Sequence, residues 1–145
     1  MTTSEAGYQL IRDEEGLVLT PKGDFGHEEI GYGHDILPGE SFPNGIGESQ
    51  AEILLRQDVA KVEKVLSLLF PSYGTQNQWE ALIDMGYECG TEALQQLLGH
   101  GWANITYQLY HADADGSQHG WIHAGGKILA GMVLRRQREI ALFNE

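Results

Sequence analysis

The segment from Ser49 to Leu69 constrains the fold most, because it predicts one long amphipathic helix. Its apolar residues recur at the three- and four-residue spacing of a helix. They are Ile53, Leu54, Leu55, Val59, Val62, Leu66 and Leu69. Ser49 and Glu52 fit a capping box at the start, and Pro71 stops the run. At about 1.5 Å per residue the helix is about 30 Å long, enough to join two lobes.

The segments on either side of this helix differ in kind. Residues 5–14 predict a short helix that Ser4 caps and Gly16 ends. Residues 17–33 are short extended pieces between turn residues, which predicts a small antiparallel sheet. Residues 37–47 form a loop by their Pro, Gly and Asn content. Further helices are expected near 76–87, 91–98, 102–110 and 130–143.

One helix, a small sheet and then helices only is the order of an α+β chain. We expect a single domain over residues 1–145. Its sheet lobe takes about 15–48 and its interlobe helix about 49–69. Residues 1–14 and 70–145 together form the helical lobe.

Composition and charge exclude several classes of function. A net charge of −12 disfavours nucleic acid and anionic membranes, which bind through Lys and Arg. The first residues lack the basic and apolar regions of a signal peptide, and no apolar run approaches a membrane span. We therefore expect a monomer made in the cytoplasm, reaching any outside target by release, injection or fusion to another chain. The single Cys89 excludes an internal disulfide framework.

Five carboxylates between residues 14 and 34 raise the question of chemistry: Glu14, Glu15, Asp24, Glu28 and Glu29. The apolar neighbours Leu17 and Leu19 should raise the pKa of Glu15, as a general acid requires. Asp24 follows in a polar turn and should stay ionised. Two carboxylates in unlike surroundings are typical of glycoside hydrolysis. The alternative is a solvated acidic surface, to which we assign Glu14 and Glu28.

The spacing of these residues resembles that of the phage-type lysozymes, the muramidases of phage endolysins. Glu15-Gly16 ends the first helix, Asp24 follows nine residues later, and IGYGH ends at His34. The segments SQAEILLRQDVAKVE, WEALIDMGYECG and WIHAGGKILAGMVLRRQREIALF resemble later family segments in the right order. The resemblance implies a two-lobed fold with a substrate cleft. It also implies hydrolysis of the β-1,4 bond between N-acetylmuramic acid and N-acetylglucosamine, with no metal or other cofactor.

The same resemblance implies roles for three carboxylates. Glu15 is the general acid, and Asp24 holds the water or stabilises the positive transition state. Glu29 stands where the family has a Thr that holds the water, and the turn before it is one residue shorter. Glu29 therefore acts as a base, giving inversion, or attacks the anomeric carbon, giving retention. A carboxyl separation of about 6.5–9.5 Å favours the first and about 5–5.5 Å the second.

The resemblance places Gly33, His34, Tyr87 and Glu88 at the substrate. We expect His34 to pair with Asp58. Glu88 takes the place of a cleft-lining Asn or Gln, and its alternative is an exposed side chain near a helix end. Arg135 should pair with one of the acidic residues at positions 13–15, and near Glu15 it would lower that pKa. The alternative for Arg135 is an ordinary surface pair.

The segment HADADGSQHGWIH is rich in metal-ligand residue types, which are His111, Asp113, Asp115, His119 and His123. A calcium loop counted from its glycine would put Ile122 where a bidentate Glu is needed. His119 and His123 have the spacing of a zinc-binding helix, but Gly120 disfavours a helix there. We therefore expect a polar surface loop without a metal.

Two alternatives to a peptidoglycan hydrolase remain open. The same fold could cleave another β-1,4 amino-sugar polymer such as chitosan, whose positive charge suits an acidic cleft. A glycan-binding remnant without activity would bind peptidoglycan but release no reducing ends. The intact pair of Glu15 and Asp24 disfavours the remnant.

Overall fold

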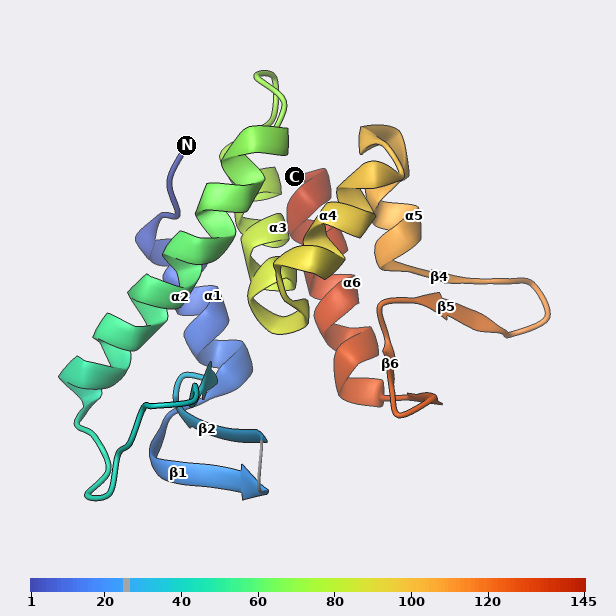
Figure 1. The fold of residues 1–145 in the computed structure, drawn as a ribbon. Helices are drawn as coiled ribbons and strands as arrows, with labels where there is room; N and C mark the ends of the chain where they lie inside the picture. Colours follow the sequence, from blue (N-terminus) through green and yellow to red (C-terminus); the bar gives the residue numbers. More distant parts are fainter. Residues whose placement is uncertain (25–26) are drawn as a thin grey trace.

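The computed structural model describes residues 1–24 and 27–145, and Figure 1 traces its path. Helix α1, Glu5–Glu15, opens the chain. The side chain of Ser4 accepts hydrogen bonds from the backbone N–H groups of Ala6 and Gly7, as the sequence predicted. The helix ends at Gly16, whose φ of 69° suits glycine best. Glu15 is therefore the last residue of α1.

A three-stranded antiparallel sheet follows in the order β1-β2-β3. Its strands are β1 Val18–Asp24, β2 His27–Gly31 and β3 His34–Asp35. Ile30 and His34 are register partners and both are buried, whereas the next pair, Glu29 and Asp35, is exposed. Because side chains alternate across a strand, Glu29 and Asp35 share the face opposite to Ile30. The predicted small sheet is confirmed.

Helix α2, Glu48–Leu69, is the predicted long helix and measures about 33 Å. The expected capping box is wrong, because the helix begins after Gly47 and no side chain caps it. The carboxylate of Glu52 binds Arg12 and Arg56 instead, at 2.8 and 2.7 Å. The Glu52 carboxylate that the capping box required is therefore engaged in these ion pairs. The predicted apolar stripe holds in its centre, but Ile53 and Leu69 are about half exposed at 49% and 48%.

Helix α3, Gln76–Cys89, lies between α2 and α6 in the centre of the helical lobe (Figure 1). It contacts α1, α2, α4 and α6, so every residue from Trp79 to Gly86 is buried. Thr75 and Gln78 form a capping box at its start. The remaining helices are α4 Thr91–Gly99, the 3-10 turn η1 Trp102–Asn104, α5 Ile105–Leu109 and α6 Ala130–Asn144.

Two short hairpins correct the expectation that only helices follow the first sheet. One pairs β4 Tyr110–Ala112 with β5 Gln118–Gly120, and the other pairs β6 His123–Ala124 with β7 Lys127–Ile128. Gly120 has a φ of 117°, and a Cβ there would lie 2.2 Å from the carbonyl oxygen of Leu109. A glycine at this position allows the two backbones to approach closely, as the paired strands of a hairpin require. The first hairpin extends from the helical lobe in Figure 1.

None of the helices in the described part of the chain combines the length and apolar character that a membrane span requires.

Candidate active site

Glu15 lies where α1 meets the sheet, and the turn after β2 packs against its carboxyl group. Gly33 has a φ of 78°, and a Cβ at this position would lie 2.9 Å from Oε2 of Glu15. Only a residue without a side chain can approach the carboxyl group so closely. Gly33, the second glycine of the IGYGH segment, therefore allows the backbone to pack directly against the carboxyl group of Glu15.

An arginine from the last helix reaches the same carboxyl group. Nη1 of Arg135 donates to Oε1 of Glu15 at 2.6 Å. The rest of the guanidinium donates to both carboxylate oxygens of Asp84, at 3.0 and 2.8 Å. The side chain of Asp84 is 1% exposed and that of Arg135 is 6% exposed. The expectation of a pair with Glu15 is confirmed, and the alternative of a surface pair is wrong. Glu14, which was also a candidate, binds Arg138 instead.

The pKa of Glu15 is raised above its ordinary value. Burial of the carboxyl group is the main cause, and the negative charges of Asp84 and Glu88 add to it. Arg135 works in the opposite direction without cancelling the effect. The expected direction and its expected cause, burial, are both confirmed, but the two leucines expected to supply that burial are exposed. Leu17 and Leu19 are 40% and 43% exposed, so burial comes from the contact with Gly33 and the packing around Arg135.

His34 bridges two carboxylates beside this site. Its Nδ1 lies 2.6 Å from Oδ2 of Asp58, the predicted partner, and its Nε2 lies 2.9 Å from Oε2 of Glu40. Glu40 sits in an irregular loop, where no periodic pattern in the sequence marks it. Burial alone would lower the pKa of His34, but its two hydrogen bonds outweigh this effect and the pKa is raised.

We expect this raised pKa to make stability depend on pH. A raised pKa adds stability that is complete below the unfolded value of about 6.5 and disappears as pH rises through the folded value. His34→Gln should therefore lower the free energy of unfolding more at pH 5.5 than at pH 9. Urea unfolding at both pH values measures the difference, with His100→Gln, at the exposed end of α4, as the control. A loss that does not vary with pH would contradict the role of the bridge.

A groove of about 190 Å³ opens between the sheet and the helices beside Glu15. Gly33, His34 and Asp35 line its sheet side, and Asp58, Lys61, Val62, Gly86, Tyr87, Gly90 and Thr91 are among the residues from α2, α3 and α4. The hydroxyl of Tyr87 donates to the carbonyl of Tyr32 at 2.5 Å, which links the two sides. Three residues expected at the substrate, Gly33, His34 and Tyr87, thus come together in one groove.

Glu88 is paired with arginines of α6 and is not the exposed residue of the alternative interpretation. Its Oε2 accepts a hydrogen bond from the buried Arg136 and lies 3.6 Å from Nε of Arg135. The side chain is 22% exposed, so the alternative of an exposed residue near a helix end is wrong. Arg136 also binds the buried Glu139 at 2.5 Å. Glu88 is therefore held by the two arginines of α6.

The other two proposed catalytic carboxylates lie in the sheet. Glu29 is exposed on β2, with Lys22 of β1 and Asp35 of β3 as its register partners. Asp24 is the last residue of β1 and pairs with His27 through the backbone. The side chain of Asp24 lies outside the part of the chain that the structure describes.

A largely buried carboxyl group with a raised pKa, beside a groove between a small sheet and a helical lobe, is an arrangement that suits a lysozyme-like protein. The phage lysozyme family model matches residues 12–139. The chain therefore belongs to the phage lysozyme family.

Named relatives agree with this assignment. The chain is 30% identical to the endolysin of Lactococcus phage c2 over all of its own length and 61% of that protein. It is 36% identical to the endolysin of Bacillus phage PZA over 99% of its length and 55% of that protein. The chain thus spans less than two thirds of either relative. The solved muramidase domain of SpmX from Asticaccaulis excentricus is 26% identical, with a TM-score of 0.75 over 99% of this chain and 98% of that one.

Proposed function

We propose that the protein is a muramidase that hydrolyses the β-1,4 bond between N-acetylmuramic acid and N-acetylglucosamine in peptidoglycan. One observation carries the proposal: the carboxyl group of Glu15 is largely buried against Gly33, a residue that lines the groove, and its pKa is raised. The two relatives named as endolysins and the SpmX muramidase domain support the choice of peptidoglycan. Release of soluble dye from dye-labelled, purified peptidoglycan tests the activity. No release above the buffer control would contradict it.

Glu15 acts as the general acid in this mechanism. A raised pKa keeps the carboxyl group protonated closer to neutral pH, so that it can donate a proton to the glycosidic oxygen as the bond breaks. Arg135 holds the carboxyl group in place through its 2.6 Å hydrogen bond and moderates the pKa. Asp84 in turn fixes the arginine through two hydrogen bonds. The acid is therefore positioned by a chain of contacts that starts in the centre of α3.

The opposite side of the sugar ring is the place of Glu29 and Asp24. We favour Glu29 as the base that removes a proton from the attacking water, which gives inversion. Glu29 is exposed on the sheet between Lys22 and Asp35, so water can reach it. Asp24 follows the family role of holding the water or stabilising the positive transition state, as the resemblance implies.

Substrate binding falls to Gly33, His34, Tyr87 and Glu88. The first three line the groove. The contacts of Glu88 with Arg135 and Arg136 both use Oε2. Its Oε1 is therefore the atom that we propose for a sugar hydroxyl or amide. The reaction needs no metal or organic cofactor, and the protein works as a monomer without nucleic acid or membrane partners, on the wall after release, injection or fusion delivery.

We expect Glu29→Gln to lose most of the activity, because an amide is no base for the attacking water. Azide should restore part of the rate as a substitute nucleophile. NMR of the first product from a soluble glycan chain should show the α-anomer, which is the inverted product. Glu28→Gln is the matched control, since this neighbour points to the other face of β2. Activity like the wild type in Glu29→Gln would remove the residue from the mechanism, and a first β-product would select retention.

A further inference from the structure

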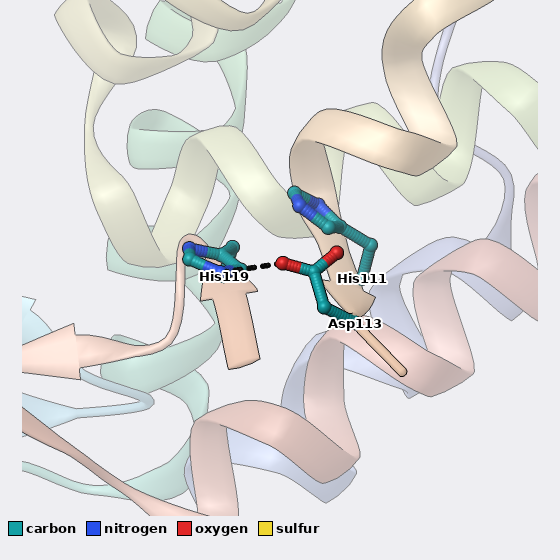
Figure 2. Close-up of side chains that lie close together, drawn as sticks. All are labelled: His111, Asp113 and His119. Carbon is teal, nitrogen blue, oxygen red and sulfur yellow. Dashed lines mark ion pairs between the residues drawn. The ribbon is translucent and has the colours of Figure 1, made fainter. Parts of the chain in front are cut away.

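The β4–β5 hairpin brings together three side chains from its two strands and the turn between them. His111 on β4 and His119 on β5 are direct register partners. Asp113 lies two residues beyond His111, so it projects from the same face of the hairpin. One ligand atom from each residue lies within 4.8 Å of the others. In Figure 2 the carboxylate of Asp113 points toward His119, and its Oδ2 lies 3.1 Å from Nε2 of that ring.

We propose that His111, Asp113 and His119 form a binding site for one Zn²⁺ ion. Two imidazole nitrogens and one carboxylate oxygen are a common ligand set for zinc, with water in the fourth position. Calcium and magnesium prefer sites made of oxygen atoms alone, so the two imidazoles disfavour them. Adjacent ligand atoms of a tetrahedral zinc site lie about 3.3 Å apart, given bond lengths of about 2.0–2.1 Å. Side-chain rotations that bring ligand atoms, now within 4.8 Å of one another, closer by up to about 1.5 Å would close the site.

The structure leaves one ring nitrogen of His111, Nε2, available to bind a metal. Its Nδ1 lies 2.9 Å from the carbonyl oxygen of Tyr107. A carbonyl only accepts hydrogen bonds, so Nδ1 carries the proton and Nε2 is left with its lone pair. A hydrogen bond from one ring nitrogen to a carbonyl is the usual support of a histidine that binds a metal through the other. The ring of His111 also stacks on Tyr107, with centroids 3.7 Å apart, which fixes its plane.

The loop holds Asp113 in position. Its backbone N–H donates to the carbonyl of Ser117 at 2.8 Å, and its own carbonyl accepts from Gly116 at 2.9 Å. Gly116 has a φ of 87°, which permits this tight turn. The hydroxyl of Ser117 lies 3.3 Å from Oδ2 of Asp113. The carboxylate is therefore placed by the backbone of the turn and supported by a neighbouring hydroxyl.

This site could not be predicted from sequence motifs, because its ligands come together across two paired strands. The sequence motifs in this segment suggested only a calcium loop or a helix carrying His119 and His123. In the structure His123 belongs to β6, outside the cluster. Ligand spacing in a hairpin depends on the register, which only the fold reveals. A zinc ion here would tie β4 to β5.

Zinc titration of untagged protein by isothermal calorimetry at pH 7.5 tests the proposal. We expect one Zn²⁺ per chain, and binding at least ten-fold weaker in His119→Gln and in Asp113→Asn. His123→Gln is the matched control, because it is a nearby exposed histidine outside the cluster, and it should bind like the wild type. Equal binding of zinc by all four proteins would overturn the proposal. The absence of binding by the wild type, at about 10 µM protein and a 100-fold excess of zinc over protein, would overturn it too. Loss in His123→Gln equal to that in His119→Gln would overturn it too.

A second measurement needs no variant. Long-range ¹H–¹⁵N NMR of the wild type should show Nε2 of His111 and His119 shifting when zinc is added, while Nδ1 of His111 stays protonated. At free zinc about 100 times the Kd, Tm should rise by about 5–10 °C. Histidine signals unchanged by zinc would overturn the proposal, as would coordination through Nδ1 of His111. Added Mg²⁺ should shift none of these signals.

Discussion

Replacing Glu15 by Gln is expected to lower the rate of peptidoglycan hydrolysis by about 10²-fold or more. The amide oxygen can still accept the hydrogen bond from Arg135, so the geometry of the site is kept. The amide cannot supply the proton that the leaving oxygen needs. Initial rates on purified peptidoglycan measure the loss, and thermal unfolding and pull-down with insoluble peptidoglycan show whether folding and binding survive.

Glu14→Gln provides the matched control for this experiment. Glu14 is the neighbouring carboxylate, and its partly buried side chain binds the exposed Arg138, so its assignment to a solvated surface is wrong. Its replacement should leave the rate within about two-fold of the wild type, because its carboxylate binds Arg138 rather than Arg135. Near-wild-type activity in Glu15→Gln, or an equal loss in both variants, would exclude Glu15 as the acid.

Among the substitutions proposed here, Arg135→Met should lower the free energy of unfolding most, by about 3–5 kcal/mol. The side chain of Asp84 is 1% exposed and depends on Arg135 for two hydrogen bonds. Without the arginine, Asp84 keeps a buried charge with no partner, and this cost exceeds the value of the pair itself. Urea unfolding at pH 7 gives the free energies of unfolding.

The neighbouring Arg138 makes the comparison direct. It lies on the same helix, is 53% exposed and pairs with Glu14. Arg138→Met should cost less than about 1 kcal/mol, because water screens exposed pairs. Similar losses in Arg135→Met and Arg138→Met would mean that the buried pair with Asp84 does not support the helical lobe in the proposed way.

Much of the fold could be predicted because its signals are local. Ser4 and Gly16 mark the ends of α1 through their own backbone preferences, and both predictions are confirmed. The apolar period of α2 predicted its length to within a residue or so. The capping box at Ser49 failed because Glu52 binds arginines from outside its own turn. The pair with Arg12 joins α2 to α1 and leaves no mark in the local sequence, whereas the pair with Arg56 is a local contact between residues four positions apart.

The hairpins after α5 were missed for a different reason. Their strands are only two or three residues long, which is too short for an alternating pattern to stand out. The polar segment from His111 to His123 looked like a surface loop on composition alone. At the end of β5 the backbone of Gly120 lies close to the carbonyl of Leu109, and that contact exists only after folding.

In the candidate site, too, features with a local sequence signal were predicted, and features that depend on long-range contacts were not. The family resemblance selected the candidate carboxylates by their spacing, and Asp58 was correctly assigned to His34. Asp84 was missed, although it fixes Arg135, because it lies 51 positions away on a helix that is buried on all sides. The rise in the pKa of Glu15 was expected from Leu17 and Leu19, which turned out to be exposed. Neighbours in sequence are a poor guide to the burial of one carboxyl group.

Mass spectrometry of the soluble products from purified peptidoglycan tests the central proposal most directly. A muramidase leaves reducing ends on N-acetylmuramic acid, and we predict these ends with the wild type and their near absence with Glu15→Gln. Products that end in 1,6-anhydro-N-acetylmuramic acid would instead identify a lytic transglycosylase. Reducing ends on N-acetylglucosamine would place the cut at the other glycosidic bond. Either of these products, or no soluble fragments from an active wall preparation, would contradict the account.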